Sequence, residues 1–287
     1  MESRFTRLDR AVLSVSGDDR ATFLQGLISN DIAKAGPDRA IWAAFLTPQG
    51  KFLYDLFIVE HDGAFLIDVE AGRAEEFRKK LSLYKLRAKV AIALTELSVF
   101  AVMNAAALDL GDAPGAARHF GGGVAYVDPR LAALGARVVL ASPETLLAAG
   151  LAETDLAAWD AVRLRAGVPD GSRDMAVDKA LLLENGFDEL GGVDFDKGCY
   201  MGQELTARTK YRGLVKKRLL PVTIDGAAPA PGTPLMAGEA EAGEMRSSWG
   251  SAGLALVRLE YLGQPLKGGA ATLTASVPDW VKLPEAE

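Results

Sequence analysis

The spacing of apolar residues predicts strands and short helices in alternation through the first half of the chain. Phe77, Leu81 and Tyr84 recur at helical spacing opposite a charged face, as in an amphipathic helix. On similar grounds, helices are expected at residues 20–25, 74–84, 143–149 and 156–165. Strands are expected at residues 11–16, 40–46, 52–59, 64–69 and 137–140, with a hairpin joining the third and fourth, and residues 90–104 are expected to contain at least one more. Residues 109–123, rich in Gly, Ala and Pro, are predicted to be a loop.

After Leu219 the pattern changes to short apolar runs separated by turns. Strands are expected at residues 219–224, 238–243, 254–259 and 271–277. A Pro-rich stretch at residues 227–234 is predicted to be a loop or a domain edge. Short strands joined by turns are typical of a small β-barrel or sandwich, which we expect at the C-terminal end.

Composition narrows the class of protein. The chain has 287 residues, 49% of them hydrophobic, which is enough to bury the core of two or three domains. A net charge of −6 argues against a positive field over the whole surface, so direct nucleic-acid binding is not expected. Cys199 is the one cysteine, and His61 and His119 are far apart in sequence. We therefore expect neither a disulfide nor a zinc site of the usual spacing.

The sequence also suggests where the protein resides. The first residues lead into no apolar segment of the kind found in signal peptides. The longest apolar stretch, residues 97–110, is interrupted by Asn104 and Asp109 and is too short to cross a bilayer. These observations predict a cytoplasmic protein without a membrane partner.

Chemistry-bearing residues are densest at residues 193–213. Gly198 and Gly202 allow the backbone to approach a ligand closely, and residues 203–210 are predicted to form a helix. Cys199 then lies at a strand-loop-helix junction, where helix amides and the neighbouring Lys197 favour its thiolate. Two interpretations are open for Cys199: a reactive thiol or a small buried apolar residue.

A basic run follows within this acidic protein. Its members are Arg208, Lys210, Arg212, Lys216, Lys217 and Arg218. One interpretation is a binding site for an anion such as a polyglutamate tail, a phosphate or RNA. The other is a solvated helix face followed by a strand edge on which lysines discourage pairing. The first is favoured for Arg208 and Arg212, and the second for Lys216 and Lys217.

Residues 197–204, Lys-Gly-Cys-Tyr-Met-Gly-Gln-Glu, resemble the signature of the YgfZ-like folate-binding family. This family is related to glycine-cleavage T-proteins and includes mitochondrial iron–sulfur assembly factors. Further segments that resemble the family are residues 23–26, 30–31, 46–51 with Asp55, 165–169, 208, 211–213 and 247–258. The resemblance therefore covers nearly the whole chain.

The resemblance implies an α+β fold like that of the T-protein. Two intertwined α/β subdomains, residues 1–215, and a C-terminal β-barrel, residues 216–287, would surround a central cavity that takes tetrahydrofolate. It also implies an accessory role in iron–sulfur cluster assembly or repair, with effects on tRNA-modifying iron–sulfur enzymes. The implied partners are folate and iron–sulfur proteins or their assembly machinery.

Site residues follow from the matched positions. Cys199 is expected to carry the chemistry with Lys197, and no metal ligands are expected. Asp55 matches the acidic residue that T-proteins place near the reactive folate nitrogens, and a carboxylate suits the donors of a pterin. The remaining folate-binding candidates are Tyr200 with Met201 and Tyr84 as ring walls, Gln203, Glu204 as a second carboxylate, and Arg208 or Arg212 for the glutamate tail.

One departure separates the chain from T-proteins that transfer an aminomethyl group. They carry Arg-x-Glu-Ala-Gly, whereas residues 163–167 have Arg165 in place of the Glu. This difference, and the Cys-centred signature that T-proteins lack, weigh against glycine cleavage. Folate-dependent aminomethyl or one-carbon transfer remains the alternative function, and an RNA-binding or interaction module using the basic run is the third.

Overall fold

The chain folds into two compact units, each built from several separate segments. The computed structural model describes residues 3–283. The first unit comprises Met1–Leu46, Tyr54–Trp159 and Gly191–Met201. The second comprises Thr47–Leu53, Asp160–Leu190 and Gly202–Glu287. The predicted boundary between residues 215 and 216 is a finer division of the second unit and stays a prediction.

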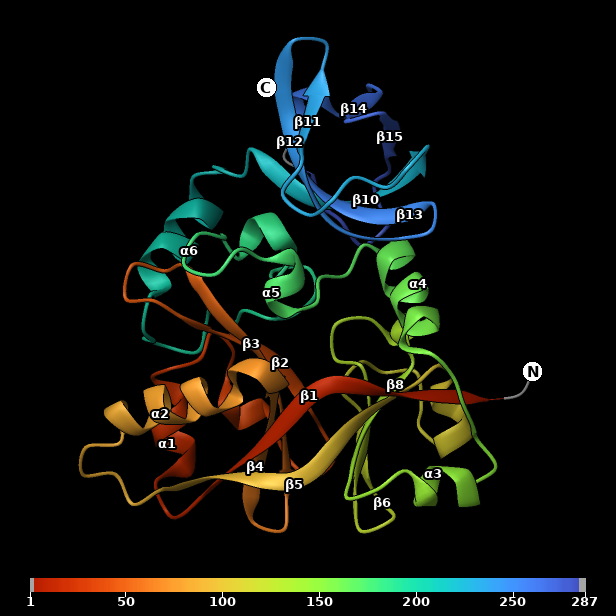
Figure 1. Cartoon of the computed structure of the whole chain (residues 1–287). Helices are drawn as coiled ribbons and strands as arrows, with labels where there is room; N and C mark the ends of the chain where they lie inside the picture. Colours follow the sequence, from red (N-terminus) through yellow and green to blue (C-terminus); the bar gives the residue numbers. More distant parts are fainter. Residues whose placement is uncertain (1–2, 284–287) are drawn as a thin grey trace. The chain divides into compact units, whose positions relative to one another are not determined.

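A nine-stranded sheet is the centre of the first unit (Figure 1). Its order is β2-β3-β4-β1-β5-β8-β7-β6, and β9 pairs parallel to β1. The strands are β1 (Arg4–Ser16), β2 (Ile41–Leu46), β3 (Phe52–His61), β4 (Ala64–Glu70), β5 (Ala91–Val102), β6 (Ala117–Phe120), β7 (Gly123–Val127), β8 (Ala136–Leu140) and β9 (Ala152–Glu153). The long strand β1 pairs antiparallel with both β4 and β5, so its polar residues can become buried between neighbours.

Short helices accompany this sheet. They are α1 (Arg20–Gln25), α2 (Ala74–Tyr84) and α3 (Glu144–Ala148), with 3-10 turns η1 (Ile32–Lys34), η2 (Ala71–Arg73), η3 (Ala105–Leu108) and η4 (Ala132–Leu134). Phe77 of α2 packs edge-on against Phe45 at 5.6 Å and lies 4.8 Å from the ring of Tyr54. These aromatic contacts bind α2 to the sheet, because each buried ring removes a large apolar area from water.

The second unit carries helices and a closed barrel. Its elements include α4 (Leu156–Ala166, which begins in the first unit), α5 (Gly171–Asp174), η5 (Leu183–Asn185), α6 (Gln203–Tyr211) and η6 (Leu259–Tyr261). The barrel order is β10-β13-β12-β11-β14-β15 (cyan to dark blue in Figure 1). The strands are β10 (Lys217–Asp225), β11 (Pro234–Ala237), β12 (Ala240–Trp249), β13 (Ala252–Arg258), β14 (Leu266–Gly268) and β15 (Ala271–Ala275). Leu220, Leu235 and Leu273 are fully buried among the residues that fill it.

Most predicted elements are confirmed, and α1 and α2 have the expected bounds. The prediction of a loop over residues 109–123 is wrong in part. β6 lies within it and pairs antiparallel with β7 at the end of the sheet. Its central residues, Arg118 and His119, are both exposed, so the segment has no apolar alternation to mark it. Over the part of the chain that the structure describes, every helix is too short or too polar to cross a lipid bilayer.

Candidate functional site

The predicted signature is divided along the chain between the two units. Lys197, Cys199 and Tyr200 belong to the first unit, while Gln203 and the rest of α6 belong to the second. Local contacts within each unit determine how the two halves of the signature are held.

Lys197 is held by the end of α1. Its ammonium group donates to the backbone oxygens of Gln25 and Ile28, each at 2.7 Å. A cation here is favourable because the last carbonyl groups of a helix carry partial negative charge. The ammonium also lies 5.0 Å from the ring centroid of Tyr200. Burial lowers the pKa of Lys197 to about 8, against the opposing effect of the Asp31 and Asp194 carboxylates.

Side-chain and backbone hydrogen bonds fix the rest of this loop. The Gln25 amide donates to the Lys197 oxygen at 3.2 Å and accepts from Ile32 N at 2.9 Å. Met201 N donates to Gly26 O at 3.0 Å, which closes the loop on its other side. Cys199 lies between these anchors and is exposed. The interpretation of Cys199 as a small buried apolar residue is therefore wrong. That Lys197 favours the thiolate form of Cys199 stays a prediction.

In the second unit, a close backbone approach holds the start of α6. Gly202, with φ +82°, precedes the helix. Gly50, with φ +81°, packs so near that a Cβ there would lie 2.6 Å from Gly202 O and 2.7 Å from Leu205 Cβ. Only glycine suits both this backbone conformation and this space.

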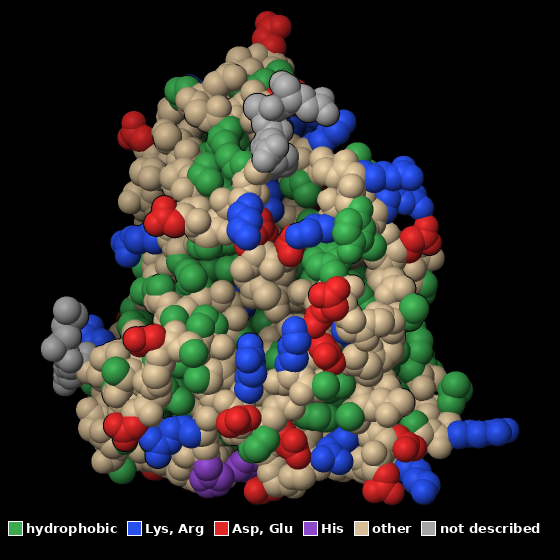
Figure 2. Space-filling model, turned by 180° about the vertical axis from the view of Figure 1, so that it is seen from behind, with side chains coloured by type: hydrophobic (Ala, Val, Ile, Leu, Met, Phe, Trp, Pro, Cys, Tyr) green, Lys and Arg blue, Asp and Glu red, His purple; other side chains and the backbone are tan. Residues whose placement is uncertain are grey.

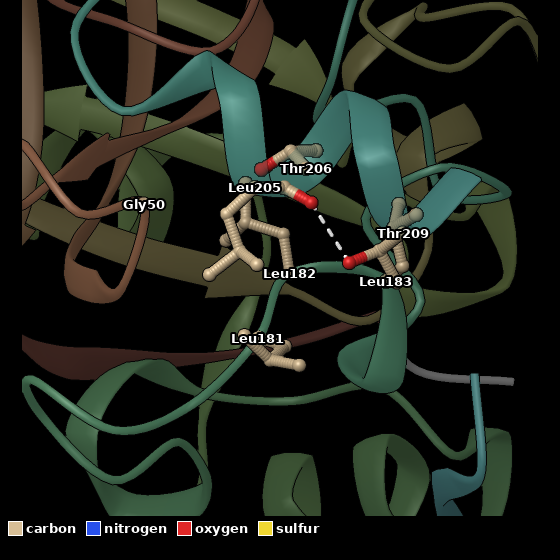
Figure 3. A pocket seen from close by; sticks show the side chains of 7 residues that line it. All are labelled: Gly50, Leu181, Leu182, Leu183, Leu205, Thr206 and Thr209. Carbon is tan, nitrogen blue, oxygen red and sulfur yellow. Dashed lines mark hydrogen bonds between the residues drawn. The ribbon is translucent and has the colours of Figure 1, made fainter. Parts of the chain in front are cut away.

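The buried face of α6 is closely packed (Figure 3). Leu205, Thr206 and Thr209 lie on residues 181–183, and the space between them has no volume for a water molecule. Thr209 Oγ1 donates back to Leu205 O at 2.8 Å within the helix (Figure 3). This face therefore positions α6 and binds no ligand itself.

The charged residues predicted on α6 face solvent. Glu204 and Arg208, one helical turn apart, form an ion pair with each other. Lys210 pairs with Asp188, and Arg212 follows the helix end and is exposed. Tyr200, in contrast, is only 9% exposed. Exposed i, i+4 pairs contribute little to stability, so the position of α6 does not depend on Glu204 or Arg208.

Asp55 is the predicted residue with the most unusual surroundings. It lies on β3, only 1% exposed, and its Oδ1 accepts from the Arg10 guanidinium at 3.0 Å. Arg10 also binds Asp68, whose other oxygen accepts from Arg137 at 2.7 Å. Within the described chain, Asp55 Oδ2 is buried without a hydrogen-bond partner. Such an oxygen costs free energy unless a ligand or a water donates to it.

The chain of buried charges extends beyond Asp55. Arg137 also donates to Asp128, and Asp128 binds Arg130 through both oxygens. Arg137 lies 3.5 Å from the ring centroid of Phe57. Burial acts to raise the pKa of Asp128, but Arg130 and Arg137 outweigh it and hold the pKa below its ordinary value.

We define the Asp55 network as the buried residues Arg10, Asp55, Asp68, Asp128, Arg130 and Arg137. Asp55 is the one member of this network that sequence analysis singles out as a site residue. A charged residue that faces inward from a strand, as Arg10 does in β1, would have indicated such a network. Which way Arg10 faces can be told only when the pairing of β1 with β4 and β5 is known.

The described residues offer little for binding a metal ion. Among residues 3–283, no three or more His, Cys, Asp or Glu side chains are grouped to hold a metal ion. The two histidines, distant in sequence, lie side by side with ring centroids 5.2 Å apart (purple in Figure 2). His61 Nε2 is 3.4 Å from Asp62, whose side chain is 85% exposed.

A unit built on a nine-stranded sheet with accompanying helices, and a closed six-stranded barrel near the C-terminal end, define a T-protein-like class of fold. In agreement, the fold matches the glycine cleavage system aminomethyltransferase T of Bartonella henselae with a TM-score of 0.79. The match covers 98% of this chain and 86% of that one at 16% identity, so it shows the fold alone. Residues 216–283 match the profile of the CAF17 C-terminal beta-barrel domain. The predicted T-protein-like fold is thereby confirmed.

The chain belongs to the IBA57 family. It is 36% identical to the mitochondrial iron-sulfur cluster assembly factor IBA57 of Mus musculus, over 96% of this chain and 84% of that protein. The human protein of the same name is also 36% identical, with the same coverage. The resemblance to a YgfZ-like family that includes iron–sulfur assembly factors is confirmed at this level, with relatives named IBA57 rather than YgfZ.

These comparisons correct one prediction. A cytoplasmic location was expected because the first residues lack an apolar segment. The relatives are instead named as mitochondrial proteins and point to that location. The prediction failed because mitochondrial targeting segments are amphipathic, so a missing apolar run does not exclude them.

Proposed function

We propose that the protein is a tetrahydrofolate-binding assembly factor for iron–sulfur clusters that acts through Cys199. Family membership supports the assembly role, since the relatives are named as iron-sulfur cluster assembly factors. The observation that carries the proposal is the exposed Cys199, the one thiol of the chain, in a loop anchored on both sides. The partners are iron–sulfur proteins or their assembly machinery, among them enzymes that modify tRNA.

Cys199 meets a cluster or a partner's sulfur at the surface. A thiolate is the form of cysteine that binds iron, and exposure gives a partner access to it. A cluster is usually held by about four protein ligands. One thiol supplies one of them, so the partner supplies the others and the cluster is cargo that passes between the two proteins.

Asp55 is the residue in the described chain that fits folate best. The ring systems of reduced folates carry several N–H donors, and Asp55 Oδ2 is a buried acceptor that lacks a donor. Arg10 holds the other oxygen and so fixes the plane of the carboxylate. Bound tetrahydrofolate would supply a one-carbon carrier. Tyr200, Gln203, Glu204, Arg208 and Arg212 are proposed as its further contacts.

Replacement of the thiol tests the role of Cys199. We expect Cys199→Ser to fold normally, because the side chain is exposed, and to fail to restore iron–sulfur enzyme activity in a deletion strain. The matched control is Cys199→Ser with Ser251→Cys, which moves the one thiol to an exposed turn of the barrel. It should fail equally. Full rescue by either variant would show that a thiol at position 199 is not needed.

Calorimetry tests folate binding separately. Tetrahydrofolate titrated anaerobically into the wild type and into Cys199→Ser should bind both with similar affinity, because the proposed acceptor is Asp55. If neither protein binds tetrahydrofolate, the folate part of the proposal is wrong, whatever the outcome of the rescue experiment.

A further inference from the structure

A groove on the first unit lies outside the proposed folate and thiol chemistry. It encloses about 400 Å³ between α1 and the segment that follows α2. Phe23 and Leu27 form its floor and are 9% and 7% exposed. Tyr84 and Leu86 stand at its rim, 38% and 89% exposed. We call it the α1–α2 groove; its volume is sufficient for one or two large apolar side chains.

The rim of the α1–α2 groove is basic. Lys85 and Arg87 line it, and neither forms an ion pair within the described chain. From residue 77 to residue 95 the chain has six Lys or Arg and no Asp or Glu, although its net charge is −6. The one carboxylate at the groove, that of Asp19, accepts from Lys89 N at 2.7 Å. An anionic occupant is therefore favoured.

The backbone at Leu86 is a second sign that this surface is used. Leu86 has φ +45°, a conformation that bulky residues rarely adopt. Its side chain is nevertheless 89% exposed, and the neighbouring Leu83 is 76% exposed. A strained backbone that presents an apolar side chain to water gives no benefit to the isolated fold, and such strain concentrates at binding sites.

We propose that the α1–α2 groove binds an acidic segment of a partner protein, which inserts an apolar side chain between Phe23 and Leu27 and pairs with Lys85 and Arg87. A membrane surface suits the groove less well. A flat bilayer cannot reach the recessed floor formed by Phe23 and Leu27.

The groove adjoins the signature loop. Gly26 lines the groove, and its carbonyl group accepts from Met201 N, two residues beyond Cys199. A partner segment in the groove would therefore be held beside the loop that carries the thiol. The inference itself rests on neither folate binding nor the reactivity of Cys199.

Selection from a random twelve-residue peptide library, displayed on phage, tests the proposal with the full chain as target. We expect enriched peptides to combine Asp or Glu with Leu, Phe or Met. Synthetic copies should bind Lys85→Glu/Arg87→Glu at least about tenfold more weakly, because two attractive charges become repulsive. The matched control, Lys179→Glu/Lys282→Glu, has the same net charge and should bind like the wild type.

Leu86→Gly separates a binding role from a structural one. Glycine accommodates the positive φ, so the melting temperature should stay equal or rise, whereas affinity for the selected peptide should fall. A fall in both would show that Leu86 serves the fold and would overturn the proposal.

Two further outcomes would overturn it. One is enrichment of peptides without acidic residues, or of peptides that bind Lys85→Glu/Arg87→Glu, the rim variant, as well as they bind the wild type. The other combines two results: no peptide is enriched, and the wild type binds vesicles of phosphatidylserine and phosphatidylcholine whereas the rim variant does not. That outcome would show that the basic rim binds a membrane. Tetrahydrofolate should bind Lys85→Glu/Arg87→Glu as it binds the wild type, because the proposed folate acceptor is Asp55. Loss of peptide binding with folate binding retained therefore concerns the groove alone, and failure of the groove proposal stays distinct from failure of the proposed function.

Discussion

Each unit buries a network of charged side chains, and the two networks differ in how completely they are hydrogen-bonded. In the second unit, we define the Arg163 network as Arg163 with Asp160, Asp170, Arg173, Asp174 and Ser247. Arg163 donates to Asp160, Asp174, Ser247 and the backbone oxygen of Val168. Its members have no buried side-chain atom without a partner among the described residues.

The Asp55 network is incomplete in comparison. Asp55 Oδ2 and one Arg137 nitrogen are buried without partners in the described chain, and so is the hydroxyl group of Tyr126, which adjoins the network near Asp68 and Arg137. A fully satisfied network fixes one packing arrangement, whereas open acceptors and donors mark places where a ligand or water belongs. The comparison therefore predicts a structural role for the Arg163 network, and it supports the binding role that we propose for Asp55.

Removal of Arg163 should have the largest effect on stability. Arg163→Met leaves the buried Asp174 and the nearly buried Asp160 without their central partner, at a cost of about 3–5 kcal/mol in the free energy of unfolding. Urea denaturation followed by tryptophan fluorescence measures it. Arg173→Met is the control, because the Arg173 side chain is 45% exposed and its ion pairs contribute at most about 1 kcal/mol. Equal losses from the two variants would contradict the structural role of Arg163.

Asp55→Asn should lower folate affinity more than stability. The amide keeps one oxygen for Arg10 but replaces an acceptor by a donor, so tetrahydrofolate should bind at least about tenfold more weakly in calorimetry. The free energy of unfolding should fall by no more than about 1–3 kcal/mol.

Asp128→Asn is the matched control within the same network. Both Asp128 oxygens bind arginines, so this change should destabilise the protein by about 3 kcal/mol or more and leave folate affinity unaltered. If Asp55→Asn lowers only stability, Asp55 Oδ2 is completed by water and the two networks do not differ in function.

The sequence predicts local elements better than it predicts these networks. α1, α2 and the hairpin of β3 and β4 follow from periodicity and glycine placement, which are properties of neighbouring residues. Arg10 resembles any polar residue of an exposed strand. Its burial arises only because β4 and β5 flank β1, pairings set by residues more than fifty positions away.

The candidate site shows the same limit. The position of Cys199 at a loop-helix junction was readable from Gly198 and Gly202. Its exposure was not, because it depends on how Lys197 docks onto the carbonyl groups of Gln25 and Ile28, far away in the chain. Tertiary hydrogen bonds of this kind leave no periodic signal in the sequence.

A pair of hydroxyl deletions gives the smallest and most direct test of the comparison. Burial raises the pKa of Tyr126, whose hydroxyl group has no partner in the described chain, so Tyr126→Phe should change the free energy of unfolding by less than about 0.5 kcal/mol or raise it. Ser247 donates to Asp174 inside the Arg163 network, so Ser247→Ala should lower the free energy of unfolding by about 1.5–3 kcal/mol. Both variants remove one oxygen from a buried site, and urea denaturation compares them directly. If Tyr126→Phe is the more destabilising variant, that hydroxyl group has a bound partner, and the Asp55 network is as complete as the Arg163 network.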